Sequence, residues 1–180
     1  MNASIQHKRS KIDLIYKFLL LINLSLLPTL FYLTNPSVSR MELEYLTEIT
    51  ALNPSFDGYS EVENRPAFRW VFEDINHPNN FLPVTIINPK YKKALEDFTG
   101  WALSFFDTQI QGVNKLKKIV SDKPEVYKKL GTHIAEGMLQ KEFGLCESKS
   151  DDEGHFNFFK YKKVDLIPHF KVINIPVAEL

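Results

Sequence analysis

Residues 18–33 read FLLLINLSLLPTLFYL and carry no charged side chain. An α-helix rises about 1.5 Å per residue, so a hydrocarbon core of about 30 Å needs roughly 20 apolar residues. The stretch reaches that length if it begins at Leu14 and Lys17 extends its ammonium group to the lipid headgroups. We therefore predict a transmembrane anchor over residues 14–33, preceded by a basic leader over residues 1–13.

A cleavable secretory signal is the main alternative to the anchor. A basic leader followed by an apolar core is typical of such signals, although this core is slightly longer than usual. Small residues at Ser37 and Ser39 would form a poor cleavage site. A third interpretation is a buried hairpin of a soluble domain.

The flanking charges predict the orientation of the chain. Residues 1–17 carry four basic side chains against Asp13, a net charge of +3, whereas the other flank is rich in glutamate. Because the positive flank stays in the cytoplasm, residues 34–180 should lie outside it. The two Asn-x-Ser matches begin at Asn2 and Asn23, where this topology allows no glycosylation. That favours a bacterial inner membrane and periplasm.

The composition of the region after the anchor limits its function. Residues 41–180 hold 17 Lys and Arg and 21 Asp and Glu, a net charge of −4. Since nucleic-acid binding needs clustered positive charge, we expect no nucleic-acid partner. Cys146 is the only cysteine and is interpreted as a small hydrophobic residue following a helix.

Hydrophobic periodicity predicts one α+β domain. A short helix over 40–52 and a loop form a linker over residues 34–66, and the domain proper covers 67–180. A long helix is expected from Pro89 to Val120. The predicted order is α-β-β-α-α-β-β, with an antiparallel or mixed sheet. The other predicted elements are strands at 67–75, 81–88, 155–163 and 169–175, and a second helix from Ser121 to Gly144.

Two clusters of side chains are candidates for chemistry. His133 and Glu136 are three residues apart, which would place them on one face of the predicted helix. His155 follows the acidic run Asp151–Asp152–Glu153. Neither cluster has the spacing of a metal site, because HExxH and the alternating ligands of a calcium loop are both missing. We therefore predict no metal and no cofactor, and regard both clusters as solvated surface.

The run Phe158–Lys163 alternates aromatic and basic residues. We interpret it as a strand with one core face and one lysine-bearing face. Contact with anionic headgroups or an acidic partner is the alternative. No Gly-x-Ser-x-Gly and no glycine-rich phosphate loop occurs in the chain.

These observations favour a non-catalytic, single-pass envelope protein whose domain binds other proteins or itself within an assembly. The 40–52 helix and the aromatic stripe of the 89–120 helix are the expected contact surfaces. A small membrane-tethered enzyme, such as a metal-dependent hydrolase, is one alternative, with His133, Glu136 and His155 as its candidate residues. A module that binds a lipid or small ligand is another.

Overall fold

A computed structural model describes residues 41–173 of the chain. The predicted leader, the anchor at 14–33 and the cleavage site at Ser37 and Ser39 lie outside these residues. Within the described range, no helix is both long enough and apolar enough to cross a bilayer. A compact unit begins at Leu43 and is the subject of the description below.

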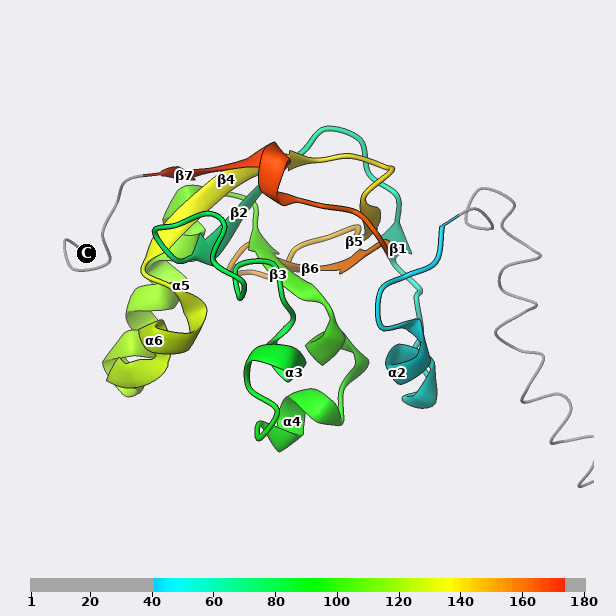
Figure 1. The fold of residues 1–180 in the computed structure, drawn as a ribbon, viewed down its shortest axis with the longest axis horizontal. Coiled ribbons are helices and arrows are strands. Elements are labelled where there is room, and N and C mark those ends of the chain that lie inside the picture. Colours follow the sequence, from blue (N-terminus) through cyan, green and yellow to red (C-terminus); the bar gives the residue numbers. More distant parts are fainter. Residues whose placement is uncertain (1–40, 174–180) are drawn as a thin grey trace, which may run out of the picture. The chain divides into compact units, whose positions relative to one another are not determined.

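The described residues form a seven-stranded sheet in the order β1-β5-β6-β3-β2-β4-β7, with every neighbouring pair antiparallel (Figure 1). The strands are β1 (Tyr59–Ser60), β2 (Arg65–Val71), β3 (Leu103–Phe106), β4 (His133–Leu139), β5 (Gly144–Glu147), β6 (His155–Lys160) and β7 (Phe170–Ile173). The α-helices are α2 (Leu46–Ala51), α3 (Val84–Ile87), α4 (Lys92–Leu95), α5 (Gln109–Asp122) and α6 (Tyr127–Leu130). Short 3-10 helices occur at η2 (Phe98–Trp101), η3 (Pro124–Val126) and η4 (Ile167–His169). The predicted α+β class with an antiparallel sheet is confirmed, but the predicted order of elements is wrong.

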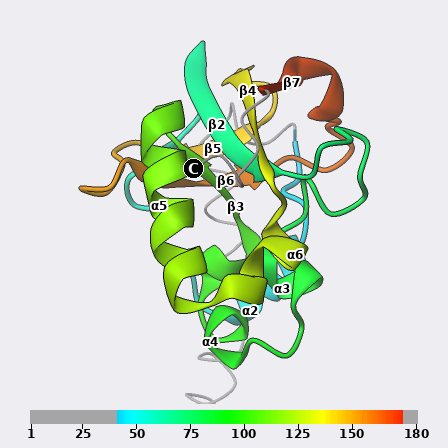
Figure 2. The ribbon, with the colours of Figure 1, turned by 90° about the vertical axis from the view of Figure 1, so that its left-hand side faces the viewer.

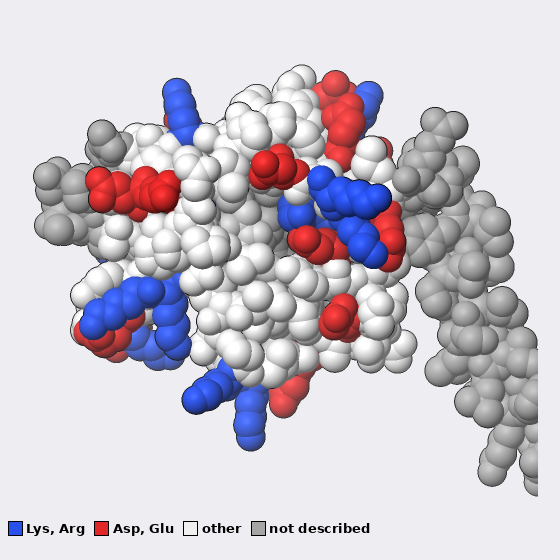
Figure 3. All heavy atoms as spheres, in the orientation of Figure 1, with Lys and Arg blue, Asp and Glu red and all other residues white. Residues whose placement is uncertain are grey.

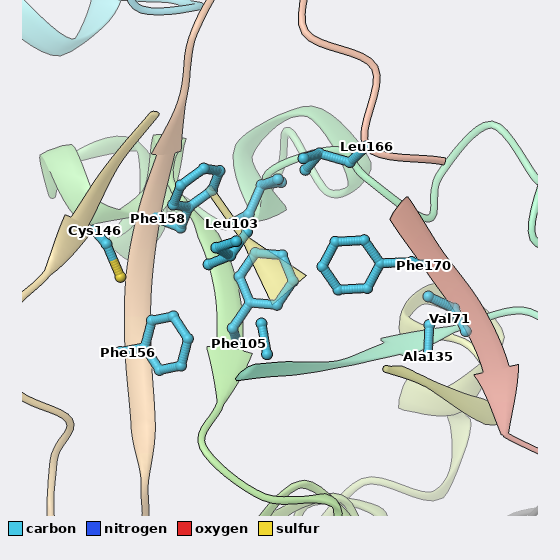
Figure 4. Close-up of a cluster of buried hydrophobic side chains, with 11 residues drawn as sticks. Val71, Leu103, Phe105, Ala135, Cys146, Phe156, Phe158, Leu166 and Phe170 are labelled. Carbon is cyan, nitrogen blue, oxygen red and sulfur yellow. The ribbon is translucent and has the colours of Figure 1, made fainter. Parts of the chain in front are cut away.

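Phenylalanine rings fill the inner face of the sheet. Phe105 on β3 lies 5.9 Å from Phe156 and 5.8 Å from Phe158, both on β6, measured between ring centroids. It also lies 5.6 Å from Phe170 on β7, although β2 and β4 separate those two strands in the sheet. The sheet is therefore strongly curved around these rings, as Figure 4 shows.

Helix α5 covers part of the outer face of the sheet. It contacts β2, β3 and β4, and Figure 2 shows it alongside the sheet. The indole Nε1 of Trp70 donates a hydrogen bond to the carbonyl oxygen of Gly112, with a length of 2.9 Å. The Thr108 side chain accepts the Gln111 N–H and caps the start of the helix. Gly112 thus lies within α5.

A second aromatic cluster surrounds η2 at the other end of the domain. Phe98 of η2 stacks on Phe159 with 5.7 Å between ring centroids, and Trp101 lies 5.6 Å from Tyr45. Ile49 of α2 is completely buried. The helix predicted at 40–52 is thus the shorter α2. It packs on the domain, and so do residues along the rest of 43–66, part of the range predicted as a linker.

The helix predicted over 89–120 is not continuous: the range is divided into α4, η2, β3 and α5, and only its last part, in α5, is a long helix. Asp97 accepts the Thr99 N–H and starts η2, and a Cβ at Gly100 would collide with the carbonyl of Ala94. The chain doubles back here, and the following residues form β3. Phe105 and Phe106 are both buried, on opposite faces of the sheet. A strand that is apolar on both faces is a continuous apolar run, and such a run fits the spacing of a helix as well as that of a strand. This ambiguity explains why a helix was predicted here.

The strand predicted over 81–88 is replaced by a loop and the helix α3. Asn80, which is buried, organises this loop with its side chain. Its Oδ1 accepts the Phe72 N–H at 2.7 Å, and its Nδ2 donates to the carbonyls of Asp74 and Ile75. These bonds fold the 72–82 segment over the end of β2, so no hairpin returns from it.

The helix predicted over 121–144 is also wrong beyond Leu130. Only η3 and α6 are helical, and residues 133–139 form β4, which pairs with β2 from Arg65 to Val71. A strand in this position completes the sheet, and that long-range pairing overrides local helix propensity. Strands β6 and β7 match the predictions at 155–163 and 169–175, but they lie in different parts of the sheet.

Candidate functional site

His133 and Glu136 do not form the pair that the predicted helix implied. Both lie on β4, where residues three apart face opposite sides of the sheet. His133 is buried on the inner face, with its Nδ1 2.9 Å from Thr132 Oγ1. Glu136 lies on the outer face, where its Oε1 is 2.7 Å from Lys171 Nζ on β7.

His155 lies on β6, away from both of these residues. Strands β3 and β2 separate β6 from β4, and at about 4.8 Å per strand this places His155 about 14 Å from β4 along the sheet. The imidazole is partly buried, and this burial lowers its pKa, while Asp151 acts against the shift. The described part of the chain therefore does not unite the three candidate residues in one site.

The acidic run before His155 is an ordered turn. Asp151 Oδ1 accepts the backbone N–H groups of Glu153 and His155 at 2.9 and 2.8 Å. The Glu153 carboxylate pairs with Lys115 and Lys118 of α5, and hydrogen bonds from both lysines lower its pKa. Over residues 41–173, no group of three or more His, Cys, Asp or Glu side chains is arranged to hold a metal ion.

Cys146 belongs to the core and not to a reactive site. It lies on β5 with no exposed surface, and burial raises the pKa of its thiol to about 11. Arg65 Nη1 lies 3.0 Å from the sulfur, while its Nη2 donates to Asp107 at 3.0 Å and to Ser150 at 2.8 Å. The predicted small hydrophobic role is confirmed, although the residue lies in a strand and not after a helix.

A groove of about 560 Å³ lies on the outer face of the sheet, beside the region that α5 covers. Pro66 of β2 lies directly opposite Met138 of β4, and Phe68 lies opposite Glu136. Because alternate residues of a strand share one face, these four side chains lie together on the outer face. The lining residues are Pro66, Phe68, Glu136, Gly137, Met138, Gln140, Pro168, His169, Phe170 and Lys171.

The groove combines an apolar surface with a polar rim. Met138 is 41 % exposed although β4 lies between two other strands of the sheet. Exposed methionine is common at surfaces that adapt to a bound partner, because the side chain is unbranched and polarisable. The Glu136–Lys171 ion pair provides one charged wall, so the groove can hold an apolar side chain beside a charged or hydrogen-bonding one.

One side of the groove is the edge strand β7. Within residues 41–173, no strand pairs with its outer edge. An edge strand presents unpaired backbone N–H and C=O groups that can pair with another extended chain. Sequence reasoning missed this site because it placed Met138 in a helix. Alternation along β2 indicated a strand, but it did not indicate that Phe68 lies on the outer face and Arg69 on the inner one.

Comparison of the chain with protein-family models, with curated proteins and with solved structures finds no match.

Proposed function

We propose that this chain is a single-pass, membrane-anchored envelope protein whose extracytoplasmic domain binds a partner polypeptide. The observation that supports the proposal is the juxtaposition of the Met138 groove with the open edge of β7. The partner contributes an extended segment that adds to the sheet beside β7. The activity is recognition and assembly, without catalysis.

Two kinds of contact would hold such a segment. Backbone hydrogen bonds to β7 supply affinity that does not depend on sequence, and alternate side chains of the segment enter neighbouring depressions. The apolar surface of Phe68 and Met138 accepts a hydrophobic side chain of the partner. Lys171, which is exposed on β7, disfavours indiscriminate pairing of edge strands and so adds selectivity.

The aromatic stripe predicted on the 89–120 helix does not support an interface. Two of its aromatic residues, Phe105 and Phe106, are buried, and the exposed Tyr91 no longer shares a helix face with them. On α2 the apolar Ile49 is buried as well. The groove therefore replaces both surfaces as the proposed binding site.

Site-specific photocrosslinking tests the proposal. A photoreactive amino acid replaces Met138 in the full chain, expressed in its native membranes, and the matched control carries the same group at exposed Lys117 on α5. We expect a polypeptide adduct from position 138 and none from position 117. A second variant, Met138→Asp, keeps the sheet intact because the side chain is exposed, and it should lose the partner in co-purification.

The mass of the adduct identifies the partner as another protein or a second copy of the chain. The absence of any polypeptide adduct, or equal adducts from both positions, would refute the proposal. The groove volume also lies within the range of small-molecule sites, about 300–1,000 Å³. An adduct with a lipid or metabolite at position 138 would therefore favour the ligand-binding alternative.

A further inference from the structure

Exposed apolar side chains gather in one short segment of the domain. Ile86, Tyr91 and Leu95 are 39, 45 and 37 % exposed, and all three lie within ten residues of each other. Exposed lysines lie among them at positions 90, 92 and 93. We call residues 86–95 the lysine-rich projection. Clusters of exposed apolar groups on a soluble surface mark a site of interaction.

Buried residues of α3 and α4 attach this segment to the domain, so that the exposed side chains point to solvent. Thr85 of α3 and Ala94 of α4 are buried, and they fix the two short helices to the domain. Tyr91 and Leu95 are four residues apart, so they share one face of the α4 turn. The projection therefore presents apolar tips and ammonium groups on a firmly attached base.

The projection lies at the η2 end of the domain. Helices α2, α3 and α4 all contact η2, and Figure 1 shows the three helices grouped below the sheet. Lysine or arginine side chains extend from the lower edge of the molecule in the region of α4 (Figure 3). The predicted anchor ends at Leu33, and residues 34–42 span at most about 32 Å when fully extended.

We infer that the lysine-rich projection is a contact site for the anionic surface of a lipid bilayer. Apolar side chains that enter the headgroup boundary, together with lysines that pair with anionic headgroups, are the physical basis of peripheral membrane binding. The inference rests on the proposed anchor, which keeps the domain near the bilayer. The contact would give the domain a defined orientation on the membrane.

The contact is weak on its own and becomes effective because the anchor holds the two surfaces close together. Each lysine close to an anionic surface strengthens binding about five-fold. Glu96 and Asp97, which follow the projection and are exposed, oppose this effect. Lys129 reinforces it, since its Nζ lies 3.1 Å from Asn88 Oδ1. Replacing Lys90, Lys92 and Lys93 should thus weaken the contact on the order of 100-fold.

Fluorescence quenching by brominated lipid tests the inference in the full chain. Tyr91→Trp places an indole in the projection, and Met138→Trp places a matched indole in the groove. Both chains are reconstituted into phosphatidylcholine vesicles with or without phosphatidylglycerol, the anionic lipid. The unsubstituted chain, whose two tryptophans are Trp70 and Trp101, gives the background fluorescence. Flotation of the vesicles reports separately whether the chain remains anchored.

We expect lipid quenching of the indole at 91, only with phosphatidylglycerol, and its loss when the three lysines are replaced by glutamine. The indole at 138 should not be quenched by lipid. Equal quenching at both positions, quenching that ignores the lysines, or none at 91 would overturn the inference. Protection of the indole at 91 from iodide without lipid quenching would show that a protein covers the projection, which also overturns it. If the chain does not float together with neutral vesicles, that result contradicts the predicted transmembrane anchor and not the lipid contact of the projection.

Discussion

Arg69 offers the sharpest test of how the domain is held together. Its guanidinium is buried, forms no ion pair with a carboxylate of residues 41–173, and donates to three backbone carbonyls, those of Asn80, Ser104 and Leu82, at 2.6, 2.8 and 2.8 Å. These bonds attach the 72–82 loop and β3 to β2. Burial lowers the arginine pKa to about 10, a cost of about 3 kcal/mol for the charged form.

Replacing Arg69 with methionine removes both the bonds and this cost. Hydrogen bonds to a charged group contribute about 1.5–3 kcal/mol each, and three carbonyls lose their partner. After the recovered desolvation cost is subtracted, we expect a loss of about 1.5–6 kcal/mol. Lysine keeps the buried charge but cannot reach three carbonyls with one ammonium group. Arg69→Lys should therefore destabilise the domain at least as much as Arg69→Met.

The measurement is urea unfolding of the full chain in mild detergent, followed by tryptophan fluorescence. Trp70, which bonds to α5, reports the loss of the sheet–helix contact. The control is Lys117→Met at an exposed position, where we expect a change within about 0.5 kcal/mol. A loss below about 1 kcal/mol for Arg69→Lys, or a methionine variant less stable than the lysine variant, would refute the reasoning.

Four further predictions follow from other parts of the chain. Gly137→Ala should cost about 1–3 kcal/mol in urea unfolding, because a Cβ there would lie 2.5 Å from the His169 carbonyl oxygen; an unchanged midpoint would contradict that packing. Cys146 should resist iodoacetamide in the native state and react fully after denaturation, since its thiol is buried with a pKa of about 11; rapid native labelling would show that β5 opens. Burial lowers the pKa of His155 below its ordinary 6.5, so its contribution to stability is present above pH 6.5 and is lost as the pH falls through the folded pKa; His155→Gln should flatten this slope in unfolding experiments, and an identical slope would assign it to other groups. A reporter enzyme fused after Leu180 should be active only outside the cytoplasm, and cytoplasmic activity would overturn the predicted orientation.

The α+β class and the strands at β2, β6 and β7 could be predicted from the sequence because each has a local signal. Alternation along β2 and the clustering of Phe156, Phe158 and Phe159 on β6 are patterns of a few consecutive residues. The uncharged run over 18–33 and its basic flank are likewise local, and they led to the prediction of an anchor and an orientation.

The failures lie where distant partners decide the structure. Leu103–Phe106 and His133–Leu139 have helical spacing and helix-forming neighbours, yet both join the sheet because they pair with strands far away in the chain. The loop over 72–82 depends on the side chains of Asn80 and Arg69, whose partners no local pattern reveals.

The candidate site depended on the same long-range contacts. The groove takes its lining from β2, β4 and β7, three strands that become neighbours only after the sheet has formed. The sequence by itself determined a mixed α+β composition, a weakly acidic domain and a core cysteine. Only the tertiary structure decided that His133 and Glu136 face opposite sides, that Met138 is exposed beside an open edge, and that residues 86–95 project. Burial of a strand is set by its neighbours in the sheet, and sequence periodicity carries no record of which neighbours those are.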